Sequence, residues 1–312
     1  MTAWASADSV PDQSGRTVLV TGANSGLGFE TARALAKKGA AVLLGCRNET
    51  KGKEAVARIR AEVDNAKLEL VLMDLASLES VRNAAKLLEA EHPSLDGLVN
   101  NAGLMALPPT KTKDGFEMQL GTNHLGHFAL TSLLLPLLHK GTKPRVVNVS
   151  SIYHKMGKLD ADDLFFERRG YDKWAAYAQS KLANLLFTYE LDRKLRKAAI
   201  PIASLAAHPG YSATELQTKG PRIEGSGIAE RVMTFSNALF AQSQEKGALP
   251  QLRALTDPNA QGGEYYGPSG FQELRGAATL VQPAKRARDG ASSAALWRRS
   301  VELTNESFAA LA

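Results

Sequence analysis

The chain has 312 residues, of which 44% are hydrophobic and 22% charged, and its formal net charge is +6. A chain of this length can bury one large core, and this composition excludes a disordered or fibrous protein. The basic residues are spread along the chain without interleaved aromatic side chains, which argues against a nucleic-acid-binding surface.

Cysteine usage and the termini predict a soluble protein. Cys46 is the single cysteine, which excludes an internal disulfide and fits a reducing compartment such as the cytoplasm. Residues 1–14 lack the basic start and apolar stretch of a signal peptide, and no window reaches the ~20 apolar residues of a membrane span. Because no His/Cys cluster has zinc spacing, no metal site is predicted.

Strands and helices alternate along the first two thirds of the chain. Strands are predicted over 17–20, 41–44, 68–73, 95–99, from 145 and over 202–207, and helices over 31–38, 54–63, 77–91, 116–139 and through Tyr177 to about 197. This alternation predicts one α/β domain over 1–312, with a doubly wound parallel sheet and helices on both faces. A ligand is expected beyond the carboxyl ends of the strands.

The last third is more irregular. Residues 211–227 become polar and are predicted to form a flap, followed by helices over 228–239 and 244–255, so that 211–256 covers the substrate. Residues 264–267 predict a short closing strand. Residues 276–312 form a polar, partly helical tail whose docking the sequence leaves open.

A glycine-rich turn, TGANSGLG at residues 21–28, joins the first strand to the first helix. Gly22 permits a sharp exit from the strand, Gly26 lets backbone approach a pyrophosphate, and Gly28 allows close packing of the helix. The amides that begin the helix can then face phosphate. The spacing Gly-x-x-x-Gly-x-Gly differs from the common fingerprint, and an ordinary glycine-rich turn is the alternative. We therefore expect a dinucleotide site on a Rossmann-type sheet.

Tyr177 and Lys181 lie four residues apart in a predicted helix, so both side chains project from one face. A free phenol has a pKa of about 10, and a nearby ammonium in a water-shielded site favours its ionised form. An exposed helix surface carrying a Tyr and a Lys is the alternative. Together with the glycine turn, the pair indicates a cofactor next to a proton donor, which are the requirements of a hydride-transfer enzyme.

Three further motifs follow strands: LVNNAG at 98–103, RVVNVSS at 145–151 and HPG at 208–210. With these motifs the chain resembles the single-domain branch of the short-chain dehydrogenase/reductase family over residues 15–215. The segments YAQSKLANLLF at 177–187 and NHLGHF at 123–128 most resemble retinol-dehydrogenase-like and protochlorophyllide-reductase-like members. Many retinol dehydrogenases carry a membrane anchor, and this sequence departs from them in showing none.

The resemblance implies a catalytic set of Asn123, Ser151, Tyr177 and Lys181. Tyr177 would be the acid in reduction and the base in oxidation, and Ser151 would donate a hydrogen bond to the substrate oxygen. Ser150 could be confused with Ser151, and is then its structural neighbour. Lys181 would bond the nicotinamide ribose. Asn123 would hold a water that relays protons from Lys181, although a simple helix-to-strand tie is the alternative.

The resemblance also implies a cofactor set. Asp74 would bond the adenine amino group, with Leu75 beside it. NAD-dependent enzymes place an acid after the second strand, whereas this chain has Arg47 and Asn48, which favours NADP over NAD unless Arg47 only faces solvent. The predicted cofactor-binding residues are Gly22, Asn24, Ser25, Gly26, Leu27, Gly28, Arg47, Asn48, Asp74, Leu75, Asn101, Ala102, Gly103, Tyr177, Lys181, Pro209, Gly210, Ser212 and Thr214.

The expected substrate pocket is apolar, which suits a lipophilic aldehyde, ketone or alcohol. Its predicted lining residues are Leu104, Met105, Leu107, Met156, Trp174, Tyr211 and Leu216. For the histidines, helix packing and loop hydrogen bonds are the favoured roles; His154 lies nearest to the site, and contact with substrate is its alternative role. The insertion over 153–173 is expected to shape the pocket or to disturb helix-mediated contacts between subunits, so a homo-oligomer stays open.

The working hypothesis is an NADP-dependent oxidoreductase that moves hydride between nicotinamide and a lipophilic carbonyl or alcohol. A catalytically silent NADP-binding sensor is the alternative, but it should have lost Asn123, Ser151, Tyr177 or Lys181, and all four are present. An epimerase or dehydratase of the longer branch should carry Gly-x-x-Gly-x-x-Gly and a larger substrate domain, and neither is found in the sequence.

Overall fold

The computed structural model describes residues 4–211 and 242–311. Within these ranges the chain forms an eight-stranded sheet in the order β3-β2-β1-β4-β5-β6-β7-β8. The strands are β1 Thr17–Thr21, β2 Ala41–Cys46, β3 Leu68–Leu72, β4 Gly97–Asn100, β5 Arg145–Val149, β6 Ala203–Ala207, β7 Tyr265–Pro268 and β8 Ala278–Leu280. The strand order reverses between β1 and β4, which confirms the predicted doubly wound sheet and puts the expected ligand site at their carboxyl ends.

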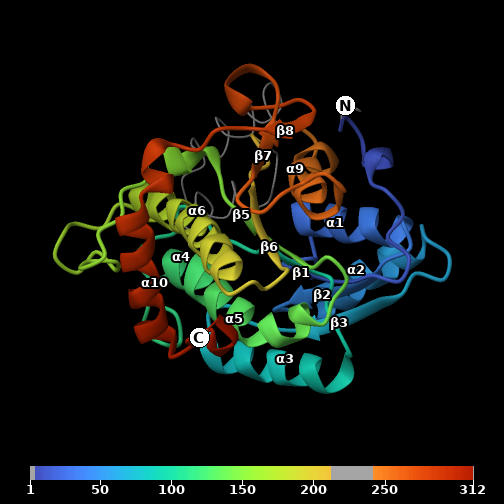
Figure 1. The fold of residues 1–312 in the computed structure, drawn as a ribbon, viewed down its shortest axis with the longest axis horizontal. Helices are drawn as coiled ribbons and strands as arrows, with labels where there is room; N and C mark the ends of the chain where they lie inside the picture. The colour runs from blue at the N-terminus through green and yellow to red at the C-terminus, as the bar shows by residue number, and fades with distance from the viewer. Residues whose placement is uncertain (1–3, 212–241, 312) are drawn as a thin grey trace.

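Helices cover both faces of the sheet (Figure 1). On one face lie α1 (Gly26–Lys37), α2 (Glu49–Arg60) and α9 (Gln244–Thr256). On the other lie α3 (Leu78–Glu91), α5 (Gly126–His139) and α6 (Lys173–Lys197). Because both faces are covered, every residue of the central strands β4 and β5 is buried. Among the helices that the structure describes, none is both long and apolar enough to cross a bilayer.

Side-chain caps fix where the helices near the site begin. The Ser77 hydroxyl accepts a hydrogen bond from Ser80 N at 3.3 Å and starts α3, as predicted. Asp172 Oδ1 accepts from Trp174 N and Ala175 N, at 3.1 and 2.7 Å, and starts α6. This cap therefore sets the position at which α6 presents Tyr177 to the carboxyl end of the sheet.

The helix predicted over 116–139 is interrupted. It begins as α4 (Met118–Leu120), passes through a π-helical turn η2 (Gly121–Leu125) and continues as α5. Gly126 lies so close to the neighbouring loop that a Cβ there would be 2.4 Å from Leu75 O. Because π-helical turns have no hydrophobic period of their own, the sequence pattern gave no sign of this one.

The C-terminal segment completes the hydrophobic core on the face of the sheet that α3, α5 and α6 cover. Helix α10 (Gly290–Thr304) packs along α6 (Figure 1). The Phe128 ring lies 5.2 Å from the Trp297 ring and 4.9 Å from the Phe308 ring between centroids. The predicted closing strand is confirmed as β7, whereas the antiparallel β8 was not predicted. Except for Tyr211, the predicted flap and the helix over 228–239 lie outside the described residues.

We expect Phe308→Ala to lower the free energy of unfolding by about 3–5 kcal/mol, because Phe308 is 1% exposed and its removal leaves a cavity among aromatic rings. Phe271→Ala is the matched control, since Phe271 is 79% exposed and its truncation should change stability by less than about 0.5 kcal/mol. Urea denaturation measures both. Equal effects of the two substitutions would contradict the docking of the tail described above.

Candidate active site

The glycine turn has the backbone that its residues predict. Gly22 and Gly26 adopt φ of +67° and +60°, in the left-handed region that favours glycine. A Cβ at Gly28 would lie 2.3 Å from Gly22 O and 2.6 Å from Asn101 Nδ2. Ser25 precedes α1 without a side-chain cap, so the first amides of α1 are not satisfied by a capping side chain. The turn is therefore a cradle in which backbone amides can receive phosphate.

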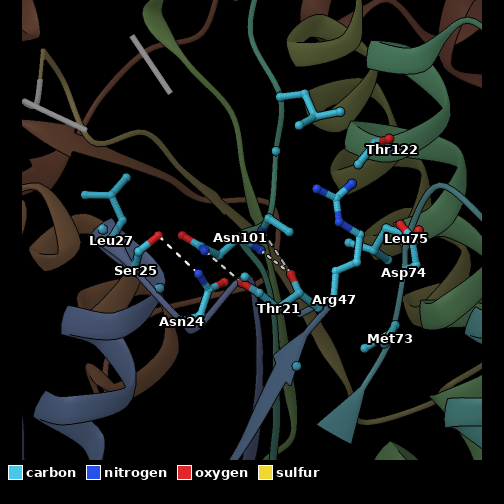
Figure 2. Close-up of a pocket in the computed structure, with 17 residues that line it drawn as sticks. Thr21, Asn24, Ser25, Leu27, Arg47, Met73, Asp74, Leu75, Asn101 and Thr122 are labelled. Atoms are coloured by element: carbon cyan, nitrogen blue, oxygen red, sulfur yellow. Dashed lines mark hydrogen bonds between the residues drawn. The ribbon is translucent and has the colours of Figure 1, made fainter. Parts of the chain in front are cut away.

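A cleft at the reversal of strand order contains most of the predicted cofactor set (Figure 2). Twelve predicted residues line it: Gly22, Asn24, Ser25, Gly26, Leu27, Gly28, Arg47, Asp74, Leu75, Asn101, Ala102 and Gly103. Thr21, Gly45, Met73, Leu104 and Thr122 also line it and were not in the predicted cofactor set, although Leu104 was predicted for the substrate pocket. Asn48 has another role, because its Oδ1 accepts from Lys51 N at 2.9 Å and caps α2.

Arg47 is the cationic residue among those that line the cleft. It is exposed, and its side chain extends beyond the end of β2 (Figure 2). Asp74, at the end of β3, lines the same cleft, and its Oδ1 accepts from Ala76 N at 3.0 Å. Arg47 is thus placed at the side of the cleft where the second strand of a doubly wound sheet meets the nucleotide ribose.

The two asparagines of the NNAG motif hold strands together. Asn101 donates from Nδ2 to Thr21 O at 2.8 Å, which ties β4 to the glycine turn. Asn100 donates from Nδ2 to Asn148 Oδ1 at 2.8 Å and to Thr131 Oγ1 at 3.0 Å, which ties β4 to β5 and to α5. These bonds hold the strand ends that form the floor of the site.

A second cavity of about 270 Å³ adjoins the cleft, and three members of the predicted catalytic set, Ser151, Tyr177 and Lys181, line it. The two share Leu27, Asn101, Gly103 and Leu104. The predicted residues that line the second cavity are Leu104, Met105, Ser151, Trp174, Tyr177, Lys181, Pro209, Gly210 and Tyr211. Ile152 and Tyr153 line it as well; Ile152 was not predicted, and Tyr153 begins the insertion over 153–173 that was expected to shape the pocket. Ser212, Thr214 and Leu216 lie outside the described residues.

Tyr177 and Lys181 are buried on the same face of α6, at 8% and 4% exposure. Lys181 Nζ lies 5.8 Å from the Tyr177 ring centroid and donates to Val149 O at 3.1 Å. Burial lowers the pKa of Lys181 to about 8. Burial also raises the pKa of Tyr177 to about 12, opposed by its hydrogen-bonding with the Ser151 hydroxyl. The expected lowering of the Tyr177 pKa is therefore not produced by the protein groups alone, and the phenol keeps its proton at neutral pH.

The structure separates the roles of the two adjacent serines. Ser150 Oγ donates to Lys181 O at 2.8 Å, so its hydroxyl is used to hold α6 against β5. Ser151 Oγ accepts from Tyr153 N at 3.3 Å, and its hydroxyl proton is not needed for that bond. Ser151 is therefore the serine whose hydroxyl can donate to a substrate oxygen beside Tyr177.

Asn123 lies in the π-helical turn, and its side chain connects this turn to Leu104 and Ser180 by hydrogen bonds. Its Oδ1 accepts from Leu104 N at 2.7 Å, and its Nδ2 donates to Leu104 O and Ser180 Oγ, both at 2.9 Å. A Cβ at Gly103 would be 3.3 Å from both Asn123 Oδ1 and Lys181 Nζ. The side chain thus secures the loop in front of Lys181, and the water relay from Asn123 to Lys181 stays a prediction.

Leu107 and Met156, which were expected at the pocket, have other places, and His154 has the packing role that was favoured for it. His154 is fully buried, its Nδ1 lies 2.6 Å from Ser151 O, and its Nε2 accepts from Ala284 N at 3.1 Å. It therefore fastens the C-terminal segment behind Ser151, and it is absent from the described lining of the cavity. Met156 is 61% exposed and also absent from that lining. Leu107 contributes its carbonyl oxygen to Tyr171 OH at 3.0 Å and does not appear among the described lining residues.

Residues 16–222 match the family model described as short chain dehydrogenase. This range contains the glycine cradle, the serine after β5 and the Tyr–Lys pair on α6. The chain belongs to the short-chain dehydrogenase family. As a member it is an oxidoreductase that acts on CH–OH groups.

Relatives narrow the branch to retinol-dehydrogenase-like proteins. Retinol dehydrogenase 13 of Homo sapiens is 41% identical over 93% of this chain and 84% of its own length. Polyprenol dehydrogenase of Mus musculus is 40% identical over 95% of this chain and 85% of its own length.

Solved structures agree with this placement. An uncharacterised protein from Mycobacterium paratuberculosis has a TM-score of 0.80 and 42% identity, over 98% of this chain and 99% of its own. A short chain dehydrogenase from Shigella flexneri, complexed with NADP, has a TM-score of 0.62 and 25% identity, over 81% of this chain and 96% of its own. Since the family's fold binds NAD(P), the cradle of Gly22, Gly26 and Gly28 is the part of this chain that fits a dinucleotide.

We expect Gly28→Ala to weaken binding of nicotinamide dinucleotide by at least about tenfold, because the added Cβ must displace the Gly22 carbonyl or the Asn101 amide. Fluorescence titration with the reduced dinucleotide measures the dissociation constant. Gly170→Ala is the matched control, since its Cβ would meet nothing within 4 Å and its φ lies outside the left-handed region. If both variants bind like the unsubstituted protein, the cradle is not the dinucleotide site.

Proposed function

We propose that this protein is an NADP-dependent oxidoreductase that transfers hydride between nicotinamide and a lipophilic aldehyde, ketone or alcohol. The observation that carries the proposal is one cavity in which Ser151, Tyr177 and Lys181 meet an aromatic and apolar wall beside the glycine cradle. The intact set of Ser151, Tyr177 and Lys181 also favours an enzyme over a silent NADP-binding sensor.

The preference for NADP is supported by the end of β2. The residues there are Gly45, Cys46, Arg47 and Asn48, so the strand ends without the acid that would bond both ribose hydroxyls. Arg47 lines the cleft and is exposed, and its guanidinium can bind a phosphate through two parallel hydrogen bonds. The complex of the Shigella flexneri relative with NADP supports the same cofactor here.

The lipophilic substrate is supported by the wall of the second cavity. Tyr153 stacks on Trp174 with 5.3 Å between ring centroids and meets the Tyr177 ring edge-on at 5.6 Å. Leu104 and Met105 extend this wall. Such rings and aliphatic groups bind apolar substrate by excluding water and cannot neutralise an anionic one. The relatives named for retinol and polyprenol support a substrate of this class.

The proposed mechanism assigns one task to each residue of the site. When bound, the nicotinamide supplies or accepts the hydride. Ser151 donates a hydrogen bond to the substrate oxygen, where negative charge develops during reduction. Tyr177 Oη gives its proton to that oxygen, or receives it during oxidation. Lys181 places a positive charge under the phenol, and the surrounding burial keeps water from weakening these interactions.

The state of the single cysteine supports a proposed cellular location. Cys46 is buried, and burial raises the pKa of its thiol to about 11, so it stays protonated and unreactive. A protein with this one thiol needs no oxidising compartment, which supports a location in the cytoplasm. The proposed partner is a small lipophilic substrate.

We expect Tyr177→Phe to lower kcat by about 10²–10⁴-fold, because proton transfer by a positioned acid has that magnitude. Its affinity for NADPH should change little, since the ring that packs in the site is kept. Tyr189→Phe is the matched control on α6: its hydroxyl has no hydrogen-bond partner within residues 4–211 and 242–311, and full activity is expected.

Reduction of a panel of lipophilic aldehydes and ketones, followed by NADPH absorbance, measures both variants. Full turnover by the Tyr177→Phe protein would overturn the assignment of the acid. NADPH binding without turnover of any member of the panel would favour the sensor.

We expect Arg47→Asp to lower kcat/KM with NADPH by roughly 10- to 100-fold relative to NADH, since one charge-assisted hydrogen bond contributes about 1.5–3 kcal/mol. The ratio of kcat/KM for the two cofactors measures this. Lys53→Gln removes an exposed cation from α2 outside the cleft and should leave the ratio unchanged. An unchanged ratio in Arg47→Asp would contradict recognition of the 2′-phosphate by Arg47.

A further inference from the structure

The loop between β7 and β8 has an unusual backbone for its sequence. Gln272 and Glu273 adopt φ of 49° and 60°, although neither is glycine. The loop is closed by Ser269 N donating to Ala277 O and Gly270 N donating to Arg275 O, both at 2.8 Å. Left-handed backbone at bulky residues is retained only where surrounding contacts impose it, and such positions concentrate at functional sites.

The contacts that impose it converge on the Glu273 carboxylate. Oε1 lies 3.0 Å from Lys155 Nζ, and Oε2 lies 3.1 Å from His208 Nε2. Lys155 ends the 3₁₀ turn Ile152–Lys155, which Ser151 caps. His208 immediately precedes Pro209. One carboxylate therefore joins the segment after β5 to the segment after β6, and both segments line the second cavity.

The His208 ring is held in one orientation and one tautomer. Gly210 N donates to Nδ1 at 3.2 Å, so the proton of the neutral ring is on Nε2 and faces Glu273. Burial lowers the pKa of His208, which keeps the ring neutral. The ring fits only because residue 267 is glycine, where a Cβ would be 2.1 Å from His208 Nε2.

The backbone of the same loop holds the next residues of the cavity. Leu274 O accepts from Tyr211 N at 2.8 Å. A Cβ at Gly210 would be 2.4 Å from Leu274 O, and Gly210 has φ of +67°. Gln242 Nε2 donates to Pro209 O at 2.6 Å, and Gln242 Oε1 accepts from Gly276 N at 3.3 Å. Residues 209–211 are thus set against the β7–β8 loop.

We propose that Glu273 is a positioning residue that holds the Ser151 turn and the Pro209–Tyr211 segment in the mutual placement that the reaction requires. This inference rests on the proposed function, because it treats both segments as walls of the reacting site. Glu273 does not line the described cavity, and it acts through Lys155 and His208. Hydrogen bonding with His208 lowers the pKa of Glu273 to about 2, so the carboxylate is ionised throughout the working range.

The test compares Glu273→Ala and Glu273→Gln with Glu306→Ala. Glu306 forms a similar ion pair with Arg82 at 2.9 Å, on α3 and away from the cavity. Glu273→Ala is expected to lower kcat/KM by about 10- to 100-fold and to weaken NADPH binding, because a displacement of about 1 Å is enough for such a loss. Glu273→Gln should recover part of the activity, since its single amide oxygen can still accept from one of the two groups, Lys155 or His208. Glu306→Ala should keep the kinetic constants of the unsubstituted protein.

A second measurement separates positioning from proton transfer and from stability. The pH dependence of kcat should keep its midpoint in Glu273→Gln, and a shifted midpoint would overturn the positioning role. Lys155→Met should lower kcat/KM in the unsubstituted protein and have a smaller effect in Glu273→Gln, because the loss of the carboxylate charge already weakens the contact that Lys155→Met removes. This pair also serves if Glu273→Ala does not fold.

The outcomes are distinct. If the Glu273 variants lose thermal stability as Glu306→Ala does but keep kcat, KM and NADPH affinity, the proposal is overturned and Glu273 is only structural. If the unsubstituted protein reduces nothing in the panel, the proposed function fails. Positioning is then judged from NADPH affinity by fluorescence titration, where unchanged binding in Glu273→Ala overturns it.

Discussion

The hydroxyl of Thr21 is the contact on which the geometry of the site depends. Thr21 Oγ1 accepts hydrogen bonds from Asn101 N at 2.9 Å and Ala102 N at 3.0 Å, and it lies 2.9 Å from His127 Nε2. It therefore joins the end of β1, the end of β4 and the start of α5 in one buried cluster. His127 Nδ1 lies 3.0 Å from Asn123 O, which extends the cluster into the π-helical turn. The glycine cradle and the loop in front of Lys181 are placed by the same few bonds.

Burial of the Lys181 amine lowers the stability of the folded chain. The pKa of Lys181 falls from 10.5 to about 8 on folding, which corresponds to about 3 kcal/mol of lost stability while the amine is charged. The folded chain binds fewer protons than the unfolded chain between pH 8 and 10.5, so this group makes stability rise with pH across that window. The same burial raises the pKa of the Tyr177 phenol to about 12, so the phenol stays protonated at neutral pH. Stability is thus exchanged for a dry site in which charges interact strongly.

Much of the fold and of the site could be predicted from the sequence, because the signals for strands, helix starts and tight turns lie within a few residues of one another. Buried strands such as β2 are continuous apolar runs, Ser77 marks a helix start by its capping hydroxyl, and Gly28 marks close packing by its lack of a side chain. The Tyr–Lys pair needs only a helix to bring its members to one face. Where the sequence was wrong, the cause is tertiary. Met156 stands close to Ser151 in the chain, but the 3₁₀ turn that starts there leaves its side chain exposed to solvent, whereas the buried His154 has the packing role that the sequence favoured.

The groups that the sequence missed are those whose partners lie far along the chain. The sequence described the tail only as polar and partly helical. The packing partner of Trp297 and Phe308 is Phe128, which precedes them by more than 160 residues, so no local pattern could predict the contact. Glu273 is a similar case: the sequence shows one acid in a loop, and only the fold joins it to Lys155, 118 residues earlier, and to His208. Catalytic motifs follow strands because a parallel sheet gathers strand ends at one edge. The residues that set those ends against one another can come from any segment that crosses the edge, and in this chain the β7–β8 loop is such a segment.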